Sequence, residues 1–152
     1  LSLRAEILTH FAARFDHVDT VIRPALAEGQ IVLCDRFTDS TMAYQGYGRA
    51  EGQPAVLDLI AALQAQLGLM PDMTFLLQAP REITRQRLAV RGVPTDRYEK
   101  ADEAFHARIA AGFMAIADQQ PERVKCITTA NHSQEAVSSL IMKEILPRLP
   151  HV

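Results

Sequence analysis

Apolar side chains in the first part of the chain recur every three or four positions, the spacing that places them on one face of a helix. This spacing predicts an amphipathic helix from about Leu3 to Glu28. Pro24 is expected to break the helix, because proline lacks the backbone N–H and crowds the preceding turn, and Gly29 is expected to end it. The apolar positions that share the face are Leu8, Phe11, Phe15, Val18, Ile22 and Leu26.

Short apolar runs without strict alternation are typical of strands buried on both faces of a parallel sheet. Such runs are found at residues 30–34, 73–79 and 124–129. Helical patterns separate them, which indicates the α/β class: a parallel sheet flanked by helices, with Gln30–Cys34 as a central strand. Three strands are few for such a sheet, so we expect N-terminal strands to be missing from this chain. The predicted helices are 40–46, 54–67, 81–91, 102–118 and 133–146, with a loop at 92–95.

Composition and charge narrow the classes of function. The 152 residues carry a net charge of −2 and no long run of either sign, which disfavours a polynucleotide-binding face but leaves room for a small basic pocket. Cys34 and Cys126 lie in apolar runs, so we expect them to be buried, reduced thiols of a cytoplasmic protein. No apolar stretch is long enough to cross a membrane, and the start is not signal-like.

Asp35 and Arg36 follow the first predicted strand directly. In open α/β sheets ligands bind beyond the carboxyl ends of the strands, so this pair has the position of a site. One interpretation is a salt-bridged pair at a strand end. The other is that Arg36 grips an anionic oxygen with its planar fork, while Asp35 holds a metal-bound water or a nucleophilic hydroxyl.

Two further groups offer polar or stacking contacts. Ser40, Thr41, Tyr44 and Gln45 supply hydroxyls and an amide that suit the edges of a base and a sugar, although a helix cap and ordinary surface would explain them equally. Phe11 and Arg14 are three residues apart and therefore share a helix face. They could stack on a flat ring and bond its exocyclic oxygen, or could be a core phenylalanine and a solvated arginine.

The chain is rich in arginine between residues 81 and 97. Arg87 and Arg91 are spaced to share a helix face, which on its own is most often a solvated face. However, Arg91 leads into a loop with Gly92 and Pro94 that carries Arg97. A mobile loop with arginines suits phosphoryl transfer, in which fixed cations stabilise charge that spreads over the phosphate oxygens.

Three segments in order resemble the bacterial thymidylate kinase family. They are AEILTHFAARFDHVDTVIRPALAEGQIVLCDRFTDSTMAYQG, PDMTFLL and RGVPTDRYEKADEAFHARI. The resemblance runs from about Ala5 to Val137 and implies a P-loop kinase-like fold that phosphorylates dTMP to dTDP with ATP and Mg²⁺. It also implies a homodimer.

The resemblance also implies a nucleoside site. Phe11 is implied to stack on thymine, and Arg14 to reach its carbonyl edge. Thr41 and Gln45 are implied to face the base, and Tyr44 the deoxyribose.

On the phosphate side, the resemblance implies that Arg36 binds the dTMP phosphate. Asp35 is implied to lie near the phosphates and to hold Mg²⁺ indirectly. Arg87, Arg91 and Arg97 belong to a lid region at about 87–101 that covers ATP. The implied catalytic residues are Asp35, Arg36, Arg91 and Arg97.

The chain departs from the family pattern in places. Gln78 stands where the family often has Asp, and the sequence contains no Gly-x-x-x-x-Gly-Lys-[Ser/Thr]. We therefore expect residues 1–152 to be a single, N-terminally truncated domain that is not a competent kinase alone. The alternatives are another nucleotide or nucleoside kinase of the same fold, and a non-catalytic nucleotide-binding or assembly module.

Overall fold

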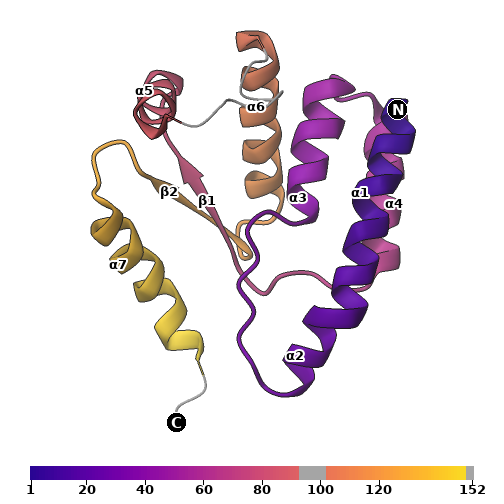
Figure 1. The fold of residues 1–152 in the computed structure, drawn as a ribbon, viewed down its shortest axis with the longest axis horizontal. Helices are drawn as coiled ribbons and strands as arrows, with labels where there is room; N and C mark the ends of the chain where they lie inside the picture. The colour runs from indigo at the N-terminus through magenta and orange to yellow at the C-terminus, as the bar shows by residue number, and fades with distance from the viewer. Residues whose placement is uncertain (93–101, 150–152) are drawn as a thin grey trace. The chain divides into compact units, whose positions relative to one another are not determined.

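The structure, a computed structural model, describes residues 1–92 and 102–149. The chain divides into two compact units. Figure 1 draws and labels their helices and strands. Unit 1 contains residues 1–71 and, within the described part, 102–118. Unit 2 contains the described residues 72–92 and 119–149.

Unit 1 begins with the predicted long helix. Helix α1 (Leu3–His17) starts at Ser2, whose hydroxyl accepts a hydrogen bond from the N–H of Ala5. A π-helical segment, η1 (Val18–Ile22), and helix α2 (Arg23–Ala27) continue it without interruption.

The helix therefore runs through Pro24, and the break predicted there is wrong. Proline lacks an N–H and its ring crowds the carbonyl four residues earlier, which an ordinary α-helical turn cannot accommodate freely. The wider π-helical segment lies directly before α2, which has Pro24 in its first turn. Gly29 ends the helix as predicted, with a φ of 76°.

The apolar face of α1 forms one core with α4 (Pro54–Leu67). Ile7, Phe11 and Ile60 are at most 1% exposed and pack together. Figure 1 draws α1 and α4 side by side, in agreement with their contacts. Burial of each such side chain contributes about 1.5–3 kcal/mol, so this cluster anchors the helix that carries Arg14. Helix α4 begins with Pro54 and ends before Gly68, as predicted.

The segment predicted as a central strand is irregular. Residues 30–37 form no strand, and Ile31 and Leu33 are 66% and 85% exposed. A strand is stable only when a neighbouring strand accepts and donates its backbone hydrogen bonds. The sheet of the described residues contains two strands and pairs neither of them with this segment. The prediction of a strand at Gln30–Cys34 is therefore wrong for the described structure.

The predicted burial of the two cysteines is also wrong. Cys34 and Cys126 are both exposed, and both are free thiols as expected. Cys34 lies in the irregular segment, and Cys126 lies in a strand of the small sheet. Apolar neighbours in sequence did not bury either thiol, because burial requires a covering element in space.

Two helical segments follow and carry most of the polar residues of interest. Helix α3 (Thr38–Thr41) continues into the π-helical segment η2 (Met42–Arg49). Helix α6 (Glu103–Gln119) approaches η2 closely through glycine: a Cβ on Gly112 would lie 2.7 Å from the Cβ of Tyr47. Arg108 on α6 also donates a hydrogen bond of 2.9 Å to the carbonyl of Gly48. These contacts fix η2 against α6.

Unit 2 contains a small parallel sheet. Strand β1 (Thr74–Gln78) pairs with β2 (Val124–Thr128), with Thr74 opposite Val124. Helix α5 (Arg81–Arg91) follows β1 and ends before Gly92, with the predicted bounds. Helix α7 (Gln134–Ile145) follows β2, and η3 (Leu146–Arg148) follows it. Ser133 caps α7: its hydroxyl accepts a hydrogen bond from the N–H of Ala136.

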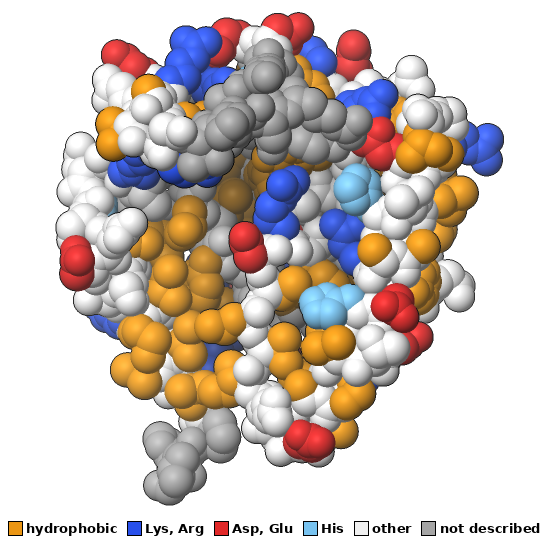
Figure 2. All heavy atoms as spheres, viewed as in Figure 1, with side chains coloured by type: hydrophobic (Ala, Val, Ile, Leu, Met, Phe, Trp, Pro, Cys, Tyr) orange, Lys and Arg blue, Asp and Glu red, His pale blue; other side chains and the backbone are white. Residues whose placement is uncertain are grey.

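The fold is thus helix-rich, with a small parallel sheet. No helix within the described ranges combines the length and the apolar character that crossing a membrane requires. On the described part of the face in Figure 2, basic and acidic side chains occur in small groups among apolar ones, and no large basic surface is seen there.

Candidate functional site

Arg36 has an unusual backbone conformation. Its φ of 63° lies in the left-handed region, which costs a non-glycine residue about 1–2 kcal/mol. Such strain persists only where the surroundings hold the residue, and it concentrates at functional positions. The residue directly before it, Asp35, is exposed and forms no ion pair with any described residue. The salt-bridged interpretation of the pair is therefore not what the structure shows.

The side chain of Arg36 is held from two sides. Its Nε donates a hydrogen bond of 3.2 Å to the hydroxyl of Ser40, and its guanidinium carbon lies 4.4 Å from the centre of the Tyr44 ring. Neither Nη atom has an acceptor among the described residues. Arg36 is exposed, so its two Nη groups can bind an anion with two parallel hydrogen bonds.

Tyr44 in turn packs against α6. The ring of Phe113 meets it edge-on, with ring centres 6.2 Å apart and an interplanar angle of 80°. Arg36, Tyr44 and Phe113 therefore form a continuous stack that reaches from the irregular segment to α6.

Arg14 lies beside the start of α3. Its Nη2 donates a hydrogen bond of 2.9 Å to the carbonyl of Phe37, and its guanidinium carbon is 5.5 Å from the centre of the Phe11 ring. Its Nη1 is buried and has no acceptor among the described residues. The pKa of Arg14 lies below its ordinary value, mainly because the guanidinium is buried. Cys34 opposes this lowering of the pKa, and the nearby Arg36 adds to it. A buried donor without a partner costs about 1–3 kcal/mol, which a ligand acceptor would recover.

The hydroxyls of Thr38 and Thr41, like Nη1 of Arg14, are buried polar groups without a partner among the described residues. Both residues are 1% exposed, and neither Oγ1 has a hydrogen-bond partner in the described part of the chain. Thr38 directly follows Phe37, whose carbonyl Arg14 binds, so this hydroxyl and the free donor of Arg14 belong to one small region.

Phe11 has the packing that its core interpretation predicts. It is 1% exposed and contacts Ile7 and Ile60, so it has no open ring face in this structure. Stacking on a base stays a prediction, and it would require a neighbour of the ring to move. Arg14, by contrast, is half-buried rather than solvated.

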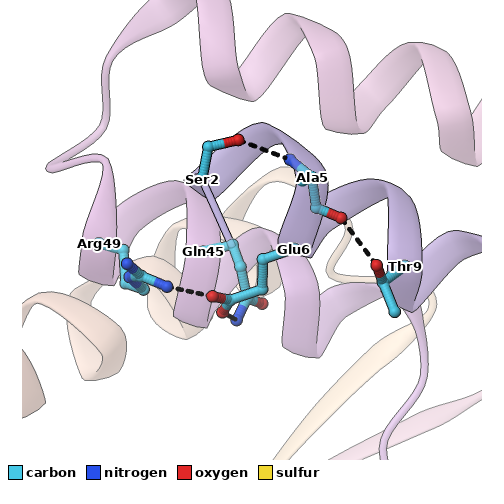
Figure 3. Close-up of polar contacts among 6 residues, drawn as sticks. All are labelled: Ser2, Ala5, Glu6, Thr9, Gln45 and Arg49. Atoms are coloured by element: carbon cyan, nitrogen blue, oxygen red, sulfur yellow. Dashed lines mark hydrogen bonds and ion pairs between the residues drawn. The ribbon is translucent and has the colours of Figure 1, made fainter.

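A buried carboxylate, that of Glu6, binds two residues of η2, Gln45 and Arg49 (Figure 3). Glu6 on α1 is 6% exposed and forms an ion pair with Arg49. Its other oxygen accepts a hydrogen bond of 2.9 Å from the amide nitrogen of Gln45, which is 2% exposed. One amide donor of Gln45 is therefore committed to this network.

The arginines of unit 2 form a separate region. The two Nη atoms of Arg87 donate hydrogen bonds of 3.0 and 2.7 Å to the hydroxyl and the carbonyl of Thr129. The N–H of Thr129 in turn donates to the carbonyl of Gln78, at 2.7 Å. Arg87 therefore ties α5 to the turn after β2. Arg91 is exposed, and the prediction for Arg97 lies outside the described residues.

The described residues hold no group of three or more His, Cys, Asp or Glu side chains arranged for a metal ion. Asp35 is the carboxylate nearest in sequence to Arg36, and it could reach a metal through water. Mg²⁺ usually keeps several waters and takes one or two carboxylates together with substrate phosphates, so a single exposed aspartate fits an indirect role.

The comparison with known proteins decides the family. A family model described as "Thymidylate kinase" matches residues 1–141. The chain belongs to the thymidylate kinase family. It is 50% identical over 145 residues to the thymidylate kinase of Gluconobacter oxydans, covering 95% of this chain and 67% of that protein. The thymidylate kinase of Exiguobacterium sibiricum is 43% identical over 144 residues, covering 95% and 66%.

A solved structure supports the same family. The thymidylate kinase from Ehrlichia chaffeensis matches with a TM-score of 0.68 and 32% identity, covering 97% of this chain and 67% of that one. The chain therefore spans about two thirds of the length of these family members. The resemblance to thymidylate kinase predicted from the three segments is confirmed.

The sequence motifs of thymidylate kinase did not reveal every residue that organises this region. Glu6, Arg49 and Phe113 were missed. Gln45 and Arg49 are four residues apart on a helical segment, which could have indicated a shared partner. Nothing local links them to Glu6, because the ion pair spans 43 positions of the chain.

Proposed function

We propose that the protein is a cytoplasmic thymidylate kinase that phosphorylates dTMP to dTDP, with ATP as donor and Mg²⁺ as cofactor, on a P-loop kinase fold. One observation supports the acceptor half most directly. Arg36, in the Asp-Arg motif of the family, has a strained backbone, a supported side chain and an open fork. That is the arrangement which bidentate binding of a phosphate requires.

In this proposal the nucleoside lies against α1, α3 and η2. Arg14 offers its partnerless Nη1 to a carbonyl of thymine, and Thr41 offers its hydroxyl. Gln45, whose amide nitrogen binds Glu6, faces the base in this proposal, and Tyr44 lies beside the deoxyribose. Phe11 stacks on thymine in this proposal once a neighbour of its ring has moved, because the ring is buried against Ile7 and Ile60.

The donor half of the proposal concerns ATP and Mg²⁺. The sequence of 152 residues contains no Gly-x-x-x-x-Gly-Lys-[Ser/Thr], so it offers no backbone cradle for the phosphates of ATP. Mg²⁺, when bound, would neutralise charge on the phosphate oxygens, with Asp35 as an outer contact. In this proposal Arg87, which binds Thr129, belongs to the lid, and Arg91 and Arg97 reach the transferred phosphoryl group.

The contribution of this chain to catalysis is positioning. Arg36 fixes the acceptor phosphate, while Arg14 and Thr41 fix the base, so that the attacking phosphate oxygen is presented in one orientation. Phosphoryl transfer depends mostly on such positioning and on fixed positive charge. Residues 87–101 form the lid in this proposal, and the whole chain acts as one nucleoside-monophosphate-kinase-like domain of a homodimer.

The test separates binding from turnover. Calorimetric titration of the 152-residue chain should show binding of dTMP, with weaker binding of dCMP and dAMP. A coupled ADP-release assay compares the 152-residue chain with an extended protein that carries every residue its gene encodes, and the extended protein should turn over dTMP. Preference for another monophosphate would favour a different nucleotide kinase. Binding of dTMP without turnover by the extended protein would favour a non-catalytic binding module.

A further inference from the structure

We propose that Phe113 on α6 is a positioning residue for the acceptor phosphate, acting through Tyr44 on Arg36. The inference rests on the proposed function, because it assumes that Arg36 binds the phosphate of dTMP. It adds a residue from a distant part of the sequence, and it gives the ring of Tyr44 a role besides contact with the sugar.

Arg36 needs contacts that restrict its side chain before it binds a phosphate. It belongs to an irregular segment whose apolar side chains, Ile31 and Leu33, are largely exposed. Its own backbone is in the left-handed region. A long, exposed arginine on such a segment has many available rotamers, and binding an anion requires most of them to be given up. Contacts that restrict the guanidinium beforehand therefore strengthen phosphate binding.

The second step is the contact of Tyr44 with Arg36. The guanidinium carbon lies 4.4 Å from the ring centre, well within the range of an attractive cation–π contact. A guanidinium stacked on a ring leaves its edge open, and that edge is where its N–H groups point. Ser40 takes the Nε of this edge, and the two Nη atoms remain for the ligand. The stack thus orients the fork without occupying it.

The third step is the contact of Phe113 with Tyr44. At 6.2 Å and 80°, the two rings have the edge-to-face geometry that aromatic pairs prefer. The backbones on both sides of this pair are fixed. Arg108 binds the carbonyl of Gly48, and Gly112 lets α6 approach Tyr47 too closely for any side chain between them. Phe113 is therefore held where it limits the movement of Tyr44.

The experiment compares two ligands that differ only by the phosphate. Calorimetric titration with dTMP and with thymidine measures the phosphate contribution as the ratio of the two affinities. Phe113→Leu should weaken dTMP binding about three- to tenfold more than it weakens thymidine binding, the size of one aromatic pair contact. Phe15→Leu is the matched control, because Phe15 packs on the hydrophobic cores of unit 1 and forms no ring contact with any described residue. It should lower the melting temperature without changing the ratio.

A second pair of variants tests the route through Tyr44. Tyr44→Phe keeps the ring and should keep the ratio of dTMP to thymidine affinity. Tyr44→Leu removes the ring and should lower the ratio, and adding Phe113→Leu to it should cause no further loss. Non-additivity of this kind identifies residues that act through one another.

Several results would overturn the inference. Phe113→Leu could weaken both ligands equally, which would indicate a purely structural residue. It could also cost as much in the Tyr44→Leu background as alone, which would exclude the route through the ring. If the unaltered chain bound dTMP no better than thymidine, the proposed function would fail first and the inference with it. If dTMP binding is strong and the ratio is insensitive to Phe113, only the inference is wrong.

Discussion

Removal of the buried carboxylate of Glu6 should destabilise unit 1 substantially. The variant Glu6→Ala leaves the amide nitrogen of Gln45 without its acceptor at a position that is 2% exposed. An unsatisfied buried donor costs about 1–3 kcal/mol. It also removes the partner of Arg49, whose side chain is 36% exposed and can turn toward solvent. That exposure reduces the loss of the ion pair to about 1 kcal/mol, well below the value for a fully buried pair.

The two contributions add to about 2–4 kcal/mol, a large part of the stability of a typical domain. In a chain of this length the change corresponds to a fall of about 5–15 °C in melting temperature. The assay is thermal unfolding followed by circular dichroism. The isosteric Glu6→Gln keeps an oxygen for Gln45 and should recover roughly half of the loss.

The chain contains a matched control for this experiment. Asp19 and Arg23 form an ion pair of 3.5 Å between side chains that are 66% and 47% exposed. Asp19→Ala removes a carboxylate from an arginine partner just as Glu6→Ala does, but it should cost less than about 0.5 kcal/mol, because both groups remain in water. If the two variants unfolded at the same temperature, the buried network of Glu6 would contribute no more than a surface pair, and the reasoning would be refuted.

Three other predictions concern Phe11, Arg36 and Arg87. Phe11→Ala should destabilise the chain by about 3–5 kcal/mol in denaturant unfolding, because it empties a core position; a folded variant of normal stability would contradict the core assignment. Arg36→Lys should weaken dTMP binding by about 1.5–3 kcal/mol in calorimetry, because the planar fork is lost although the charge remains, and unchanged affinity would exclude Arg36 as the phosphate ligand. Arg87→Lys should increase hydrogen exchange at the turn around Thr129, because lysine cannot make both hydrogen bonds; unchanged exchange there would mean that Arg87 does not hold the turn.

Elements marked by local signals could be predicted from the sequence almost to the residue. Helix α4 lies between Pro54 and Gly68, and α5 ends before Gly92, and both have the predicted bounds. Proline and glycine act within one turn of the chain, so their effect is readable locally. The strand predicted at Gln30–Cys34 failed for the opposite reason. An apolar run becomes a strand only when a neighbouring strand pairs with its backbone, and the described sheet provides no strand to pair with these residues.

The same distinction applies to the candidate site. The motif around Arg36 indicated where an anion could bind, because the residue types stand next to one another in the sequence. The left-handed backbone of Arg36, its stack on Tyr44 and the support from Phe113 depend on contacts across the fold, which no local pattern encodes. Phe11 illustrates the remaining ambiguity: helical spacing places it on a face, but cannot say whether that face meets the core or a ligand.

Because both cysteines are exposed, the molecule has two natural attachment sites for thiol-reactive labels. Cys34 lies in unit 1, with its sulfur 3.5 Å from the carbonyl oxygen of Arg36, and Cys126 lies in unit 2. Each compact unit therefore carries one accessible thiol, and no engineered cysteine is required for spectroscopy. Spin labels on the two sulfurs would report the separation of the units, and a titration with nucleotide would show whether that separation changes. The same two thiols make a reducing agent necessary during purification, because exposed thiols on separate molecules can cross-link on oxidation.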